Sequence, residues 1–274
     1  MVVITKNNIS FGLDPWYKAN LDILLQKAIP NKWDALIIVF GREGAGKSTL
    51  ASQTALYLHE QYDIKYTVFS PEQFIEVCDN CEEEAAINWD EAITGANAQM
   101  YAEQISRIII SKLTQIRKKR LKIILCFPYL WMLNKYYVSR SIFSVYTYAT
   151  AFDNRGHAKF YDSRKTELIY GLMKDRFKYD WMKAISCVKP NFYFRFSSKF
   201  ILDEEKYDIK KTESIKQAAL NPNAQNIWKE RTQKLLMYIR DKTDGTINKA
   251  ARHLDLKPHV LHSAINKDRL VQTN

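Results

Sequence analysis

The chain has 274 residues, 46% of them hydrophobic, and a formal net charge of +11. This length allows one large domain and a small one, and this hydrophobic content is ordinary for a globular protein with a core. Four cysteines are too few for a disulfide framework, no apolar run reaches the ~18 residues of a membrane span, and no signal peptide is present. We therefore expect a cytoplasmic protein without membrane contact, in a host cell's cytoplasm if a virus or plasmid encodes it. The basic charge favours a polyanionic partner, most commonly nucleic acid.

The first elements lead into a glycine-rich loop. Asp14 followed by Pro15 predicts the start of an amphipathic helix. The apolar run 35–40 predicts a buried strand, and a helical pattern follows over 49–58. Residues 41–48 between them have the pattern G-x-x-x-x-G-K-S, the phosphate-binding loop of nucleotide-hydrolysing proteins. Strand, glycine loop and helix in this order is the context that confirms the motif.

The residue types of the loop fit the binding of a nucleotide such as ATP. Glycines let successive N–H groups point at one phosphate, and the following helix adds the positive end of its dipole. Lys47 is expected to reach the β- and γ-phosphates, and Ser48 to hold Mg²⁺ through its hydroxyl. The predicted nucleotide-binding residues are Gly41, Gly44, Ala45, Gly46, Lys47, Ser48 and Thr49.

The next strands bring an acidic pair. The sequence predicts a strand over 64–69, a short helix that Ser70 caps, and a strand over 85–89 that ends at Asp90-Glu91. An acidic residue at the carboxyl end of a neighbouring strand can bind Mg²⁺, and a second carboxylate can deprotonate the attacking water. We assign Asp90 to Mg²⁺ and Glu91 as the catalytic base. The alternative is an acidic pair that only favours a helix N-terminus.

A long helical pattern with apolar residues between 105 and 116 follows, then a strand over 121–127 that Pro128 stops. Strands are predicted over 141–150 and 157–161, joined by a hairpin turn, and over 191–196 at a sheet edge. Between the long helix and the next strand lies a basic run that either is a solvated loop or contacts a phosphate backbone. Its members are Arg117, Lys118, Lys119 and Arg120.

An ATPase site of this kind also uses an arginine finger and a residue that senses the γ-phosphate. An arginine finger from a neighbouring subunit would complete the transition state, and Arg140 is the first candidate, with Arg155 and Arg117 as alternatives. The strand over 121–127 supplies no obvious polar residue that would sense the γ-phosphate, and Tyr129 is the nearest candidate.

Strands that alternate with helices indicate an α/β fold, a mostly parallel sheet flanked by helices, with an antiparallel edge from the hairpin. We expect residues 1–202 to form the nucleotide-binding domain and 203–224 a charged helical connector. Residues 225–274 are expected to form a small all-α domain.

This last domain is predicted to contain a helix-turn-helix unit, from helices over 246–254 and 258–266. The second helix would present side chains that read base edges or contact phosphates. A helical protein-interaction bundle is the alternative. The candidate DNA-contacting residues are His259, His262, Ser263, Asn266 and Lys267.

The loop, the strand end Trp89-Asp90-Glu91-Ala92, and the helix that runs into the basic run resemble additional-strand P-loop ATPases of the RecA-like kind. Within these, the layout is similar to the HerA–FtsK and zonula-occludens-toxin-like ATPases of viruses, plasmids and integrated elements. The resemblance covers roughly residues 33–150. It implies homo-oligomeric rings or filaments on DNA, with ATP between subunits. Phe127-Pro128 departs from the group, which often has Gln after this strand.

Three functions compete at this stage. The first is an ATPase that uses ATP and Mg²⁺ to act on double-stranded DNA, in translocation, packaging, segregation or replication of a mobile element. The second is a DNA-binding regulator that ATP switches. The third is a nucleotide or small-molecule kinase, although the arginine-rich lid of a kinase is not evident.

Overall fold

A computed structural model describes residues 1–90, 110–112, 114–150, 155–178 and 180–220. The chain divides into two compact units, Met1–Lys216 and Gln217–Asn274. The fold below is that of the first unit. The predicted helix-turn-helix lies outside the described residues.

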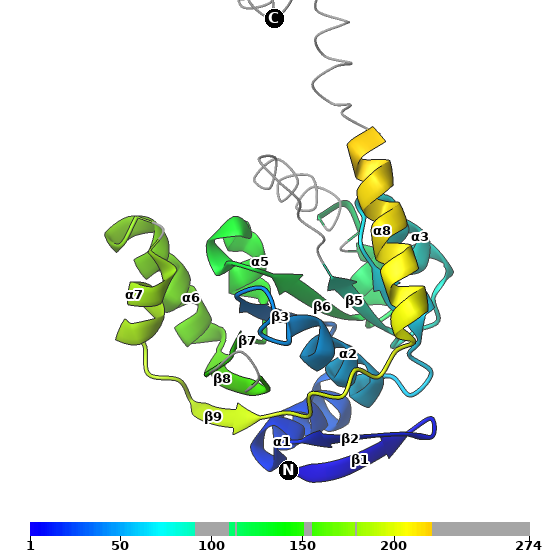
Figure 1. The fold of residues 1–274 in the computed structure, drawn as a ribbon, viewed down its shortest axis with the longest axis horizontal. Helices are drawn as coiled ribbons and strands as arrows, with labels where there is room; N and C mark the ends of the chain where they lie inside the picture. The colour runs from blue at the N-terminus through cyan, green and yellow to red at the C-terminus, as the bar shows by residue number, and fades with distance from the viewer. Residues whose placement is uncertain (91–109, 113, 151–154, 179, 221–274) are drawn as a thin grey trace, which may run out of the picture. The chain divides into compact units, whose positions relative to one another are not determined.

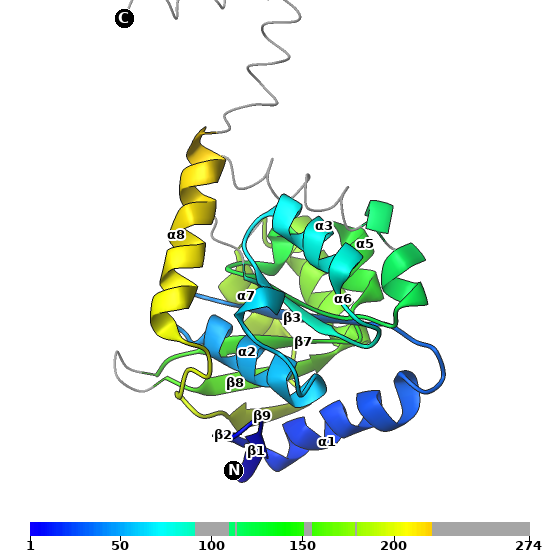
Figure 2. The ribbon, with the colours of Figure 1, turned by 90° about the vertical axis from the view of Figure 1, so that its right-hand side faces the viewer.

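The core of the first unit is a seven-stranded sheet (Figures 1 and 2). The first five strands in spatial order run parallel, and the last two add an antiparallel edge. The predicted α/β class, with a mostly parallel sheet flanked by helices, is therefore confirmed. The strands in spatial order are β4 (Thr67–Val68), β5 (Ala86–Asp90), β6 (Lys122–Phe127), β3 (Ala35–Gly41), β7 (Phe143–Tyr148), β8 (His157–Asp162) and β9 (Phe192–Arg195).

The strand order has one consequence for the site. β6 lies between β3, which leads into the glycine loop, and β5, which ends in Asp90. It is thus an additional strand between the two, as the resemblance implies. All three strands are buried along their whole length, which is typical of parallel strands with helices on both faces.

Helices cover both faces of the sheet. On one face, Tyr17 of α1 packs against Phe143 and Phe160, and its hydroxyl bonds Thr54 of α2 at 2.8 Å. On the other face, α3 packs against Trp89, and α6 binds Ser144 through Thr166. The described helices are α1 (Pro15–Ile23), α2 (Lys47–Leu58), α3 (Pro71–Asn80), α5 (Lys135–Arg140), α6 (Ser163–Gly171), α7 (Trp181–Cys187) and α8 (Glu204–Leu220). No described helix is long and apolar enough to cross a membrane.

One predicted strand needs correction, and one hairpin was not predicted. The strand expected over 64–69 shortens to Thr67–Val68, because Asp63 caps a 3-10 turn over Ile64–Tyr66. The first residues form a hairpin of β1 (Val2–Lys6) and β2 (Ile9–Leu13) that the sequence analysis missed. Asn7 and Asn8 at its turn both have positive φ, which asparagine tolerates better than most residues. The predicted caps Asp14 and Ser70 are confirmed.

Lys122, the first residue of β6, is buried and fixes the end of α2. Its ammonium donates to the carbonyl of Leu58, the last residue of α2, at 2.9 Å and to the carbonyl of Glu84 before β5. A cation at the C-terminus of a helix also opposes the negative end of the helix dipole. Burial lowers the pKa of Lys122 to about 8.

This lowered pKa predicts a pH-dependent stability. Between pH 8 and the unfolded lysine value of 10.5, the unfolded chain binds more protons at Lys122 than the folded chain, so stability rises with pH. Unfolding by denaturant between about pH 8 and 9.5 should show the stability of wild type rising relative to Lys122→Met by about 1 kcal/mol per pH unit. Buried tyrosines and Cys78 have raised pKa values and so lower the stability as pH rises, but they do so equally in both proteins. The difference in stability between wild type and Lys122→Met therefore reports Lys122 alone. Parallel stability curves would contradict the prediction.

Candidate phosphate and metal site

The glycine loop begins where β3 has no space for a side chain. A Cβ on Gly41 would lie 2.2 Å from the carbonyl oxygen of Thr147 in β7, and the φ of Gly41 is 150°. Only glycine adopts such a φ readily. The chain therefore leaves the sheet at this residue and enters the loop (Figure 1).

The loop residues have the backbone shape of a phosphate cradle. Gly44 and Gly46 have φ of 73° and 88°, and Gly46 is the N-cap of α2. A Cβ on Gly44 would meet nothing within 4 Å, whereas one on Gly46 would lie 3.1 Å from the ring of Phe196. The loop thus has an open side at Gly44 and a closed side at Gly46, and the amides at the start of α2 are available to an anion.

Lys47 lies within this loop. Its ammonium donates to the carbonyls of Gly41 and Arg42, each at 3.0 Å. Burial lowers the pKa of Lys47, and the negative charge of Asp90 opposes that shift. A desolvated ammonium held only by carbonyls gains most when an anionic phosphate approaches.

Asp90, at the carboxyl end of β5, is 4% exposed and accepts a hydrogen bond from the Tyr207 hydroxyl of α8. Ser48 lies near this hydroxyl and acts to lower its pKa. The Tyr207 ring is held edge-on by Phe69 and Phe200. Burial, and next the charge of Asp90, raises the pKa of Tyr207, so this hydroxyl stays protonated as a donor.

Ser48 and Asp90 fit a magnesium ion, because a hydroxyl and a carboxylate are oxygen ligands of the kind it prefers. Both residues act on the Tyr207 hydroxyl, Asp90 through a hydrogen bond and Ser48 through its effect on the pKa, so the two lie near one another. Among the described residues, no group of three or more His, Cys, Asp or Glu gathers as a metal site, so phosphate oxygens and water would supply the other ligands. A metal bound to both residues would require the Tyr207 hydroxyl to leave its place between them.

Tyr207 belongs to a stripe of α8 that the sequence analysis missed. Lys210 donates to the carbonyls of Ile64 and Thr67 at 2.9 and 2.7 Å, and Ser214 bonds Gln73 of α3 at 2.7 Å. The spacing of three and seven residues from Tyr207 marks one helix face, a signal that the abundant charges of this segment obscure. This part of the expected connector therefore packs on the first unit.

Arg140, the first candidate for an arginine finger, lies at the other end of the sheet. It forms an ion pair with Asp34, the residue before β3, and also donates to the hydroxyl of Tyr136. β3 separates Asp34 from the glycine loop, so the structure does not bring Arg140 to the phosphate site of its own chain. A role at a neighbouring subunit's site stays a prediction.

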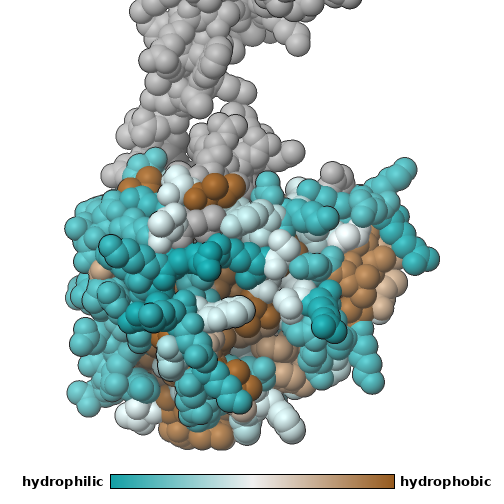
Figure 3. Space-filling view, turned by 180° about the vertical axis from the view of Figure 1, so that it is seen from behind, coloured by the Kyte–Doolittle hydropathy of each residue, from teal (hydrophilic) through white to brown (hydrophobic). Residues whose placement is uncertain are grey.

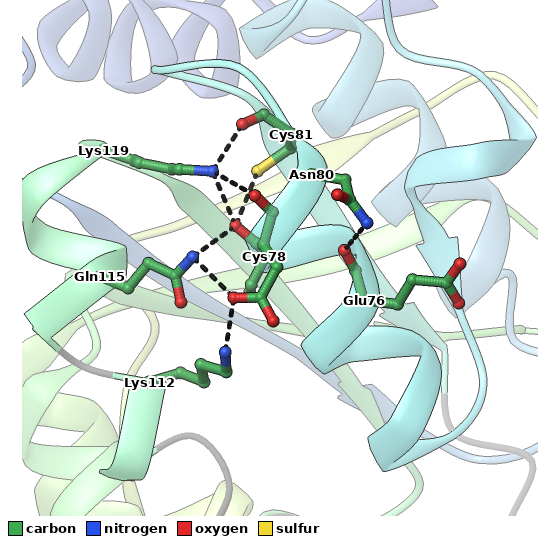
Figure 4. Close-up of polar contacts among 8 residues, drawn as sticks. Glu76, Cys78, Asn80, Cys81, Lys112, Gln115 and Lys119 are labelled. Carbon is green, nitrogen blue, oxygen red and sulfur yellow. Dashed lines mark hydrogen bonds and ion pairs between the residues drawn. The ribbon is translucent and has the colours of Figure 1, made fainter.

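The basic run has two different halves. Lys119 donates to the carbonyls of Cys78, Asp79 and Cys81 and so caps the end of α3 (Figure 4). Arg120 forms ion pairs with Glu83 and Glu84. Arg117 and Lys118 are exposed and remain available to a phosphate backbone. Lys119 and Arg120 therefore stabilise the fold itself, which leaves Arg117 and Lys118 as the candidates for contact with DNA.

Tyr129, the candidate for γ-phosphate sensing, belongs to an aromatic cluster beside the loop. It stacks on Trp131 and contacts Trp181 of α7, whose ring also lies 5.4 Å from the guanidinium of Arg42 in the glycine loop. Trp181 was not foreseen from the sequence.

Several predicted residues lie outside the described part of the chain. These are Glu91, His259, His262, Ser263, Asn266 and Lys267. Arg155 is described and exposed.

No family model matches the chain, and no curated protein matches it. Among solved structures, the AAA domain of FIGL-1 in complex with ADP is similar over 75% of this chain and 88% of that chain, with 13% sequence identity and a TM-score of 0.33. So distant a likeness carries no argument. The assignment of a P-loop fold rests on the strand order and on the loop.

The contact at Gly41 predicts a steric penalty. Gly41→Ala should lower the free energy of unfolding by about 3 kcal/mol, because its Cβ would overlap the Thr147 carbonyl in a glycine-only conformation. Gly44→Ala is the matched control, with a loss of about 1 kcal/mol from its positive φ alone. Denaturant unfolding of the two variants measures the difference, and equal losses would contradict the steric explanation.

The position of Tyr207 predicts opposite effects on stability and metal binding. Without metal, Tyr207→Phe should lose about 2 kcal/mol of stability, because Asp90 loses a charge-assisted hydrogen bond. The same change should tighten Mg²⁺ binding by about 10-fold, because no hydroxyl then competes for Asp90. The readouts are denaturant unfolding and Mg²⁺ titration with a fluorescent nucleotide.

The control for this prediction is Tyr62→Phe, which removes a buried hydroxyl that bonds Thr67 at 2.6 Å. It should cost stability and leave Mg²⁺ affinity unchanged. If Tyr207→Phe weakens Mg²⁺ binding, the hydroxyl supports the metal rather than competing with it.

Proposed function

We propose that this protein is a Mg²⁺-dependent ATPase that acts on DNA. The observation that carries the proposal is that Lys47 and Ser48, which follow the loop after β3, lie near Asp90 at the end of β5. Lys47 supplies charge for the β- and γ-phosphates, while Ser48 and Asp90 supply oxygen ligands for Mg²⁺. When bound, this ion would neutralise the charge that develops on the phosphates.

Glu91 follows Asp90 directly in the sequence and is the proposed catalytic base. A carboxylate beside a metal ligand can orient water and accept its proton. Arg140 is proposed as the finger that a neighbouring subunit receives, with Arg155 and Arg117 as alternatives.

The proposed partners are DNA and further copies of the chain. The net charge of +11 and the predicted helix-turn-helix support DNA, contacted by Arg117 and Lys118 of the basic run and by the candidate residues in 258–267. Seen from behind, hydrophobic side chains gather where α6 and α7 lie (Figure 3), and Leu168 and Met182 are exposed there. Exposed apolar side chains of this kind support an oligomer, with ATP between subunits. The work done on DNA would be translocation, packaging, segregation or replication of a mobile element.

One observation favours a second function, a DNA-binding regulator that ATP switches. Tyr207 connects the proposed metal ligand Asp90 to α8, and α8 directly precedes residues 221–274 in the sequence. Metal and nucleotide could then change the state of this helix without sustained turnover.

The decisive experiment is ATP hydrolysis with and without DNA. Wild type should hydrolyse ATP faster with DNA, and Glu91→Gln should lose at least about 100-fold of the rate while it still binds nucleotide, because only the base is removed. Glu83→Gln is the control, since Glu83 is an exposed partner of Arg120. DNA binding that depends on ATP without turnover would favour the switch. No nucleotide binding would refute both functions.

A further inference from the structure

Strands β7, β8 and β9 carry rings and cations on the sheet face that α6 covers only in part. The strand register aligns Tyr146, Lys159 and Tyr193 in one row across the three strands. The next row contains Tyr148, His157 and Arg195. We call these six residues the aromatic–basic face. Side chains of paired residues project to the same side of a sheet, so the two rows share one surface.

The centre of this face is Lys159. Its ammonium lies 5.8, 5.6 and 5.7 Å from the ring centroids of Tyr146, Tyr148 and Tyr193. A cation among three rings is attracted by each, and no ion pair within the described residues neutralises it. Burial lowers the pKa of Lys159, which reflects the cost of this environment for the charge.

The face is open to solvent along β9, whereas Tyr146 on β7 is buried. Tyr193 is 60% exposed, and Arg195 is exposed beside it. Within the described residues, no carboxylate lies within ion-pair distance of Lys159, Arg195 or Arg42. A surface of rings and unneutralised cations fits an anionic ligand with flat, apolar groups.

The face also continues to the phosphate loop. Tyr146 contacts Trp181 at 5.7 Å between centroids, and Arg42 of the loop lies over the same indole. A ligand on the face would therefore lie next to the nucleotide site.

We propose that the aromatic–basic face binds single-stranded nucleic acid. Unpaired bases stack on the accessible rings of Tyr193 and Tyr148, while Lys159 and Arg195 bind the phosphates between them. Rings that follow one another across a sheet suit successive bases, because every base has a flat face and strands bring the rings to regular spacing. A duplex keeps its base faces stacked inside and offers only its phosphates. The proposal deepens the proposed function and rests on it only for the view that nucleic acid is the partner.

The test is the affinity for a fluorescent oligothymidine of about 15 nucleotides, measured by anisotropy without added nucleotide. Tyr193→Ala should weaken binding by about 10-fold, because one stacked base is lost. Lys159→Gln should weaken it and lower the slope of log affinity against log salt by about 0.7, the value for one phosphate contact on a single strand.

Matched controls come from α5, at the other end of the sheet. Tyr136→Ala removes an exposed tyrosine and Lys135→Gln an exposed lysine, and neither should change the affinity. A duplex of mixed sequence should bind wild type and Tyr193→Ala equally. Circular dichroism of each variant shows whether it is folded.

The outcomes separate this proposal from the proposed function. Tyr193→Ala and Lys159→Gln that bind the single strand like their controls, or a wild type that does not bind it, would overturn the face as a binding site even where ATP hydrolysis is intact. Loss of nucleotide binding by wild type with the stacking effect retained would refute the ATPase and leave the face standing.

Discussion

The close approach of Gly41 to Thr147 is the constraint on which the phosphate site depends. β3 and β7 stay in parallel register up to this pair, and the last residue of β3 can carry no side chain there. The backbone turns out of the sheet with a φ of 150°, and its carbonyls then hold the Lys47 ammonium. α2 starts directly after the loop, and Lys122 fixes its far end. One steric restriction therefore sets where the loop lies, and one buried cation fixes the far end of the helix that follows it.

The carboxylate of Asp90, a proposed metal ligand, already has a hydrogen-bond partner within the chain. Asp90 is buried, and an unpartnered buried carboxylate would be costly, so the hydroxyl of Tyr207 stabilises the site in its free state. The same bond connects the site to α8, which Lys210 and Ser214 attach to β4 and α3. A ligand that displaces Tyr207 must weaken these contacts of α8. By reciprocity, the contacts must weaken the binding of that ligand by the same free energy. The proposed ATPase and the proposed switch differ only in whether hydrolysis resets this state.

The sequence predicted those parts of the fold that depend on neighbours in the chain. Buried strands 35–40 and 85–89, the loop, and the caps Asp14 and Ser70 all follow from local patterns. The strand at 64–69 was wrong because Asp63 bonds the backbone of Lys65 and so favours a turn. The bond from Tyr207 to Asp90 joins residues 117 apart, and no local pattern reports such a distance. Likewise, the edge strand 191–196 was foreseen, but the rows that it forms depend on the register of three strands.

Arg42 and Trp181 connect the phosphate loop with the aromatic–basic face. Its guanidinium belongs to the phosphate loop and lies over Trp181, while Tyr146 on the aromatic–basic face touches the same indole. The positive charge of Arg42 would attract an anion in the loop. The positive charge of Lys159 would attract the phosphates of a nucleic acid strand on the face. Among the described residues both cations contact rings and form no ion pair, so neither has to break one there to accept a phosphate. When a phosphate binds, the loss of a cation–π contact costs less free energy than the loss of an ion pair with a carboxylate. The use of aromatic residues here therefore keeps positive charge available on two adjoining surfaces of one small sheet.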